Sequence, residues 1–132
     1  MKEVAKILIA DDEPFIRRSL AFILKMNGCE VVSVKHGREA WENLNQGFEP
    51  DILFLDVMTP QFSGFKLCRL IKEHPRLRNI YVIWLTARWQ KSDKEKAESV
   101  GIDEYITKPF SPSSIVRRVR EIIEAKHEHS YG

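Results

Sequence analysis

Apolar stretches of strand length alternate with helical patterns five times along this chain of 132 residues. The expected strands span residues 5–10, 30–34, 51–56, 80–85 and 104–107. The central ones are apolar almost without a break, which is typical of parallel strands that are covered on both faces. The pattern therefore predicts an α/β fold, in which helices cover both sides of one parallel sheet.

The helical segments are bounded by residues that commonly start and stop helices. Pro14 suits the first turn of the first helix, because its missing N–H costs little there, and Gly28 suits the left-handed position after the helix. The later helices are expected over residues 37–46, around residues 65–71, and over residues 92–100 and 112–127. Right-handed connections favour a flavodoxin-like doubly wound sheet with strand order 2-1-3-4-5 and five helices. Residues 1–127 are thus expected to form one domain, with residues 128–132 as a frayed tail.

Composition excludes several classes of protein. Hydrophobic residues make up 43% of the chain and charged residues 30%, an ordinary globular balance, and the net charge of +2 is too small to favour nucleic acid or an anionic membrane. No stretch approaches the roughly 18 apolar residues that span a bilayer, and the first residues do not resemble a signal peptide. We therefore expect a cytoplasmic protein without membrane contact, whose two cysteines, Cys29 and Cys68, are reduced.

One cluster of basic residues needs a separate interpretation. Arg117, Arg118 and Arg120 lie together in the last predicted helix and could contact nucleic acid. Glu121 and Glu124 interrupt them, so a solvated helix face is the favoured interpretation.

Polar residues follow four of the five strands, where the chain leaves the sheet. They are Asp11, Asp12, Asp56, Thr86 and Lys108. Because the carboxyl ends of parallel strands meet at one edge, where ligands bind in doubly wound sheets, we expect these side chains to converge. Three carboxylates in one place repel each other, so one must be protonated or a cation must bind. Oxygen ligands of this kind suit Mg²⁺.

The same residue types suit phosphoryl transfer. An ionised Asp56 can attack phosphorus as a nucleophile. Such a transfer depends mainly on positioning and on neutralising charge, for which Mg²⁺ and Lys108 supply positive charge and Thr86 supplies a hydroxyl donor. Each residue alone is weak evidence, because Asp-Asp pairs often begin helices and a lone Asp often ends a strand in a turn. The combination at one edge is far more specific.

Four stretches of the chain carry a family resemblance. They are residues 7–14 (ILIADDEP), 56–64 (DVMTPQFSG), 84–88 (WLTAR) and 103–110 (DEYITKPF). With them the sequence resembles the receiver domain of two-component response regulators, the family of the chemotaxis receiver CheY, over about residues 6–126. The CheY sheet order is itself a known example of the doubly wound arrangement named above.

The resemblance implies specific roles for the residues of the expected site. Asp56 is implied as the phosphoacceptor, and Asp11 and Asp12 as the acids that bind Mg²⁺, with Asp12 the direct ligand. The backbone carbonyl of Met58 is implied as a further ligand. Ala87 is small, which leaves phosphodonors a clear approach.

The resemblance also implies a switch. Thr86 corresponds to the switch hydroxyl, Tyr105 to the switch aromatic residue, and Lys108 to the cation that pairs with the phosphoryl group. The Lys108–Pro109 peptide bond is implied to be cis, which is uncommon even before proline. Phosphorylation would then change the surface formed by the fourth helix, the fifth strand and the fifth helix.

Function and partners follow from the same resemblance. The chain is expected to take its phosphoryl group from a histidine kinase or a histidine phosphotransfer protein and to control a downstream protein or an output domain absent from this sequence. It is expected to catalyse only its own phosphorylation and dephosphorylation, so it is not expected to be an enzyme in the usual sense. It is also expected to be monomeric, with dimerisation on phosphorylation left open.

The alternatives are an interaction domain that works without phosphorylation, a haloacid-dehalogenase-type phosphatase and a flavin electron carrier. The phosphatase would need an Asp-x-Asp pair after the first strand, and the flavin carrier a phosphate-binding Gly/Ser/Thr loop there, where this chain has Asp11 and Asp12.

Overall fold

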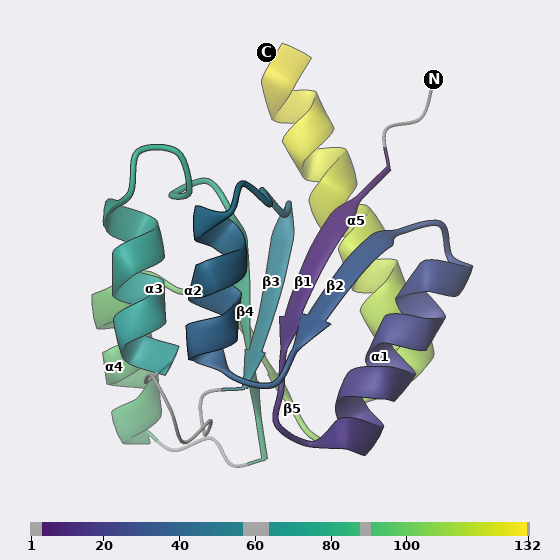
Figure 1. Ribbon diagram of the computed structural model, residues 1–132, viewed down its shortest axis with the longest axis horizontal. Coiled ribbons are helices and arrows are strands. Elements are labelled where there is room, and N and C mark those ends of the chain that lie inside the picture. Colours follow the sequence, from purple (N-terminus) through teal and green to yellow (C-terminus); the bar gives the residue numbers. More distant parts are fainter. Residues whose placement is uncertain (1–3, 57–63, 88–90, 132) are drawn as a thin grey trace.

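The structure is a computed structural model that describes residues 4–56, 64–87 and 91–131 (Figure 1). Within these residues the chain forms five strands and five helices in alternation. The strands are β1 (Lys6–Ala10), β2 (Glu30–Val34), β3 (Ile52–Asp56), β4 (Tyr81–Thr86) and β5 (Glu104–Thr107). The helices are α1 (Pro14–Met26), α2 (Gly37–Asn45), α3 (Gly64–Glu73), α4 (Lys91–Val100) and α5 (Pro112–Tyr131).

The described strands form one parallel sheet with the order β2-β1-β3-β4-β5, which confirms the predicted doubly wound fold. Helices α1 and α5 lie side by side on one face of the sheet, and α2, α3 and α4 cover the other face (Figure 1). The arrangement follows from right-handed connections between parallel strands. Because of this handedness, the direction in which the chain moves along the sheet to its next strand determines which face the connecting helix covers.

Each central strand sends alternate side chains into two separate cores. In β1, Ile7 and Ile9 pack with α1 and α5, whereas Leu8 and Ala10 pack with α2 and α3. Strands β3 and β4 alternate in the same way, with Phe54 on the first side and Trp84 on the second. Because both faces are buried, these strands can be apolar at every position, which is the pattern visible in the sequence.

The helix boundaries largely agree with the predicted signals. Pro14 occupies the first turn of α1, and Gly28 follows the helix with a φ of 86°, in the left-handed region that glycine adopts at low cost. The end of α5 differs from the prediction, because the helix continues past His127 to Tyr131 through residues expected to fray. Neither Gly nor Pro occurs there before Gly132, so nothing in the sequence stops the helix.

Both cysteines are free thiols, with Cys29 half-buried and Cys68 buried. Trp84 donates a hydrogen bond from Nε1 to Cys68 Sγ at 3.0 Å, and the Phe65 ring meets the Trp84 ring edge-on with centroids 4.8 Å apart. Trp84 is therefore a core residue, as predicted. In the described part of the chain, none of the helices combines the length and the apolar character needed to cross a membrane.

Candidate functional site

The carboxyl edge of the sheet, at the lower side of Figure 1, collects the polar residues that follow the strands. Asp11 directly follows β1, Asp56 is the last residue of β3, Thr86 is the last residue of β4, and Lys108 directly follows β5. Strands β1 and β3 are neighbours although β2 lies between them in sequence, so the strand order reverses direction at this point. Doubly wound sheets bind their ligands at such a reversal.

Three carboxylates lie together at this edge. Oxygens of Asp11, Asp12 and Asp56 all lie within 4.8 Å of one another, with Asp11 and Asp56 buried and Asp12 exposed. Burial raises the pKa of Asp11 above its usual value, and the nearby Lys108 ammonium group opposes that rise only in part. The site therefore carries concentrated negative charge that favours a cation.

Lys108 provides the positive charge that the described structure places among these acids. Its Nζ lies 2.9 Å from Asp11 Oδ2, 2.9 Å from Glu13 Oε1 and 3.2 Å from Asp56 Oδ2, and the side chain is only 8% exposed. Burial alone would lower the pKa of Lys108, but the adjacent carboxylates of Asp11, Glu13 and Asp56 raise it overall. Lys108 is therefore held as a charged ammonium group.

Glu13 joins the site although its position in the sequence did not single it out. Besides its contact with Lys108, its backbone N–H donates a hydrogen bond of 2.9 Å to Asp11 Oδ1. The residue precedes Pro14 and caps α1 with an extended backbone, which directs the chain away from β1 at this point. The sequence signal that could have identified Glu13 as a site residue is its position as a third acid directly after Asp11 and Asp12.

The acids suit a hard divalent cation. Asp11 Oδ2 is buried and, within the described ranges, accepts no hydrogen bond of acceptable geometry, although Lys108 Nζ lies at ion-pair distance. A buried carboxylate oxygen with a lone pair to spare, close to two further carboxylates, is the kind of donor set that Mg²⁺ prefers. The residues present thus fit the metal that the sequence predicts.

The remaining predicted residues lie around this centre or outside the described ranges. Thr86 is buried, and its carbonyl accepts a hydrogen bond of 2.8 Å from the Lys108 N–H, which ties the end of β4 to the loop after β5. Ala87 is exposed, and Tyr105 in β5 is 44% exposed. The Lys108–Pro109 peptide bond is cis. Met58, predicted to offer its carbonyl to the metal, lies outside the described residues.

Fold and site together define a receiver domain, and comparison with known proteins agrees. The family model of the response regulator receiver domain matches residues 7–120 of this chain. The chain belongs to this family, as its motifs predicted.

Relatives and solved structures place the chain within the family. It is 37% identical over 118 residues to the phosphate regulon transcriptional regulatory protein PhoB of Klebsiella pneumoniae, covering 89% of this chain and 51% of PhoB. It is 34% identical to protein PilG of Pseudomonas aeruginosa, covering 87% of this chain and 84% of PilG. The receiver domain of a signal transduction histidine kinase from Syntrophus aciditrophicus superposes with a TM-score of 0.84 at 34% identity, covering 92% of each chain. The chain spans about half the length of the PhoB proteins that it matches.

Proposed function

We propose that Asp56 accepts a phosphoryl group from a histidine kinase or a histidine phosphotransfer protein in a Mg²⁺-dependent reaction. The observation that carries this proposal is the position of Asp56, which is 4% exposed at the end of β3, close to Asp11 and Asp12 and 3.2 Å from Lys108 Nζ. A buried acid in this setting has both a metal site and a fixed cation beside it, which phosphoryl transfer requires.

In the transfer, a carboxylate oxygen of Asp56 attacks the phosphorus of a phosphohistidine. The P–N bond breaks, its electron pair stays on the imidazole nitrogen, and an acyl phosphate forms on Asp56. Water later hydrolyses this acyl phosphate, which releases inorganic phosphate and restores the carboxylate. The domain catalyses these steps only on its own side chain, so it acts as a switch and not as an enzyme with a separate substrate.

The neighbouring side chains have distinct tasks in this reaction. Lys108, held by Asp11 and Glu13, presents its ammonium to the oxygens of the incoming phosphoryl group. Thr86 supplies a hydroxyl donor from the end of β4. Asp11, Asp12 and Asp56 would hold Mg²⁺, together with the Met58 carbonyl that the family resemblance implies. When bound, the ion would neutralise the charge on the phosphoryl oxygens.

Phosphorylation would then shift a two-state surface made of α4, β5 and α5. The phosphoryl group adds charge and acceptor oxygens that Thr86 and Lys108 engage in one state only. Inward movement of Thr86 makes room for the side chain of Tyr105, a residue that is 44% exposed, to turn toward the sheet. The altered surface controls a downstream protein or an output domain. A Tyr105→Ala variant whose partner binding depends on phosphate as strongly as that of the wild type would contradict this role.

Intact-protein mass spectrometry with acetyl phosphate tests the chemistry directly. With Mg²⁺ the wild type should gain one phosphoryl group, and the Asp56→Asn variant and a chelator-treated sample should gain none. Beryllofluoride binding, monitored on the same samples, detects a competent site whose phosphate hydrolyses too quickly to weigh. If the wild type neither gains mass nor binds beryllofluoride, the chain is an interaction domain that works without phosphorylation.

A further inference from the structure

Arg17 is a basic residue of α1 whose side chain reaches back to the acidic site. Its terminal nitrogen Nη1 donates a hydrogen bond of 2.8 Å to the backbone carbonyl of Asp11, six positions earlier in the chain. Arg17 is half-buried, whereas its neighbour Arg18 is exposed. In the part of the chain that the structure describes, Arg17 forms no ion pair, so the Asp11 carbonyl is the partner of its guanidinium group there.

This contact lies on the peptide unit that joins the two acids. The Asp11 carbonyl belongs to the planar unit that leads to Asp12, so a donor bound to it restrains the orientation of that unit. The other side of Asp11 is fixed as well, because its N–H donates to the Val34 carbonyl at 3.2 Å. Asp12, in contrast, is exposed, and within the described ranges its side chain makes no hydrogen bond or ion pair. Arg17 thus restrains Asp12 through the backbone.

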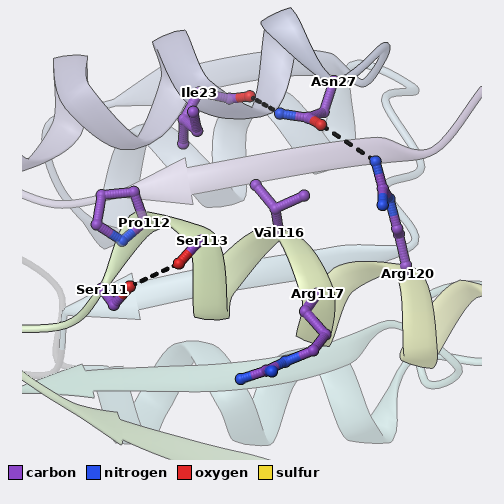
Figure 2. A pocket seen from close by; sticks show the side chains of 8 residues that line it. All are labelled: Ile23, Asn27, Ser111, Pro112, Ser113, Val116, Arg117 and Arg120. Atoms are coloured by element: carbon purple, nitrogen blue, oxygen red, sulfur yellow. Dashed lines mark hydrogen bonds between the residues drawn. The ribbon is translucent and has the colours of Figure 1, made fainter.

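Helix α1 holds Arg17 in a fixed position, because its far end is attached to α5. Asn27 accepts a hydrogen bond of 3.3 Å from Arg120 (Figure 2). A groove of about 680 Å³ lies between the two helices, with Ile23 on one wall and Val116 on the other, and both side chains also pack against the buried core. A side chain carried by a well-anchored helix can position a neighbouring group precisely.

We propose that Arg17 is a positioning residue for Mg²⁺, which orients the peptide between Asp11 and Asp12 so that both carboxylates are held ready for the metal. This role rests on the Mg²⁺-dependent function proposed above. Groups that hydrogen-bond to metal-binding residues fix the orientation of the ligands, and losing one typically weakens metal binding about 10- to 100-fold. Arg17 therefore supports the metal site without contacting the metal.

The charge of Arg17 by itself would have the opposite effect. A guanidinium group near the acids repels a cation, so on electrostatic grounds alone its removal would strengthen metal binding. A positioning role predicts weaker binding instead. The sign of the change therefore distinguishes the two roles.

The identity of the metal gives a second distinction. Mg²⁺ requires nearly ideal octahedral coordination, whereas Ca²⁺ accepts irregular arrangements of oxygen ligands. Losing the orientation of the two acids should therefore weaken Mg²⁺ binding much more than Ca²⁺ binding. Losing a positive charge acts on both divalent ions alike.

NMR titrations of the whole chain with MgCl₂ and with CaCl₂ test the proposal, and the amide spectra also show whether each variant is folded. Arg17→Met should bind Mg²⁺ about tenfold more weakly than the wild type and Ca²⁺ less than about twofold more weakly. Arg17→Gln should show the same loss, because its shorter side chain does not reach the Asp11 carbonyl, and it guards against misfolding of the first variant. Arg18→Gln is the matched control, since it removes the same charge from the next, exposed position, and should bind both metals as the wild type does.

The outcomes separate this role from the proposed function. A wild type that binds no Mg²⁺ would overturn the metal site and the role of Arg17 together. If the wild type binds Mg²⁺ and the folded Arg17 variants bind it equally well, only the role of Arg17 is wrong. Equal losses of Mg²⁺ and Ca²⁺ affinity would also overturn that role, as would the same loss in Arg18→Gln.

Discussion

Lys108 Nζ lies 2.9 Å from Glu13 Oε1, although 95 positions separate the two residues in the chain. The ammonium group donates hydrogen bonds to Glu13 and Asp56 and forms an ion pair with Asp11. Of these three acids Glu13 is by far the most exposed, with a side chain that is 55% accessible to solvent. It is therefore the partner that Lys108 can release at the lowest cost when a phosphoryl group arrives.

Glu13→Gln should make the site accept a phosphoryl group more readily. Removing this carboxylate leaves Lys108 free to turn toward the oxygens on Asp56. We expect beryllofluoride to bind about two- to fivefold more tightly at saturating Mg²⁺, which is the size expected for a partly exposed ion pair. The tryptophan fluorescence of the protein, titrated with beryllofluoride, measures this change.

Glu30→Gln is the matched control for that experiment, because Glu30 is exposed at the start of β2, at the opposite edge of the sheet. It should bind beryllofluoride as the wild type does. Unchanged or weaker binding by Glu13→Gln would mean that Glu13 does not compete for Lys108.

Lys108→Met should destabilise the metal-free protein. It leaves Asp11 and Asp56 buried without their cation, and breaking a buried ion pair in this way typically costs about 3–5 kcal/mol. Mg²⁺ should recover much of that loss, since it supplies the missing positive charge. Urea unfolding with and without Mg²⁺ measures both effects, with Lys25→Met on the exposed side of α1 as the control. A loss of equal size at saturating Mg²⁺ would argue against the metal site.

Tyr81 should contribute a pH-dependent part of the stability. Burial, together with the hydrogen bond of 2.8 Å that Tyr81 donates to Glu104, raises the pKa of Tyr81 to about 12 from 10.0. The unfolded chain then loses this proton first, so the contribution is complete below pH 10 and disappears as the pH rises toward 12. Because Tyr81 is only partly buried, we expect the wild type to lose about 1 kcal/mol more than Tyr81→Phe over this range. Parallel curves of stability against pH for the two proteins would rule this out.

Cys68 should stabilise the core through its contact with Trp84 as well as through its volume. Cys68→Ala removes the only acceptor seen for the Trp84 N–H in the described structure and opens a small cavity, for an expected cost of about 2–3 kcal/mol. In a Trp84→Phe background the same change should cost about 1 kcal/mol less, since no N–H is left unpaired. Urea unfolding of the four proteins gives this coupling, and strictly additive costs would mean that the hydrogen bond contributes nothing.

The basic cluster of α5 shows where reasoning from sequence reached its limit. Arg117, Arg118 and Arg120 are close in sequence, but the structure sends them to different places. Arg118 turns toward β5, where its Nε donates to Glu104 Oε1 at 2.8 Å and its terminal nitrogen to the Tyr81 hydroxyl at 3.1 Å. Arg117 and Arg120 line the groove beside α1. Successive residues of a helix point about 100° apart, so the neighbouring elements decide what each side chain meets.

The sequence by itself determined the alternation of strands and helices, the parallel sheet and its strand order. It also determined which residues follow the carboxyl ends of the strands, because apolar runs buried on both faces leave a clear pattern and right-handed connections allow few arrangements. Only the tertiary structure decided that Glu13 shares Lys108 with the buried acids and that α1 and α5 leave a groove between them. Those contacts join long side chains from distant segments, and their reach depends on packing angles and rotamers that no local pattern records.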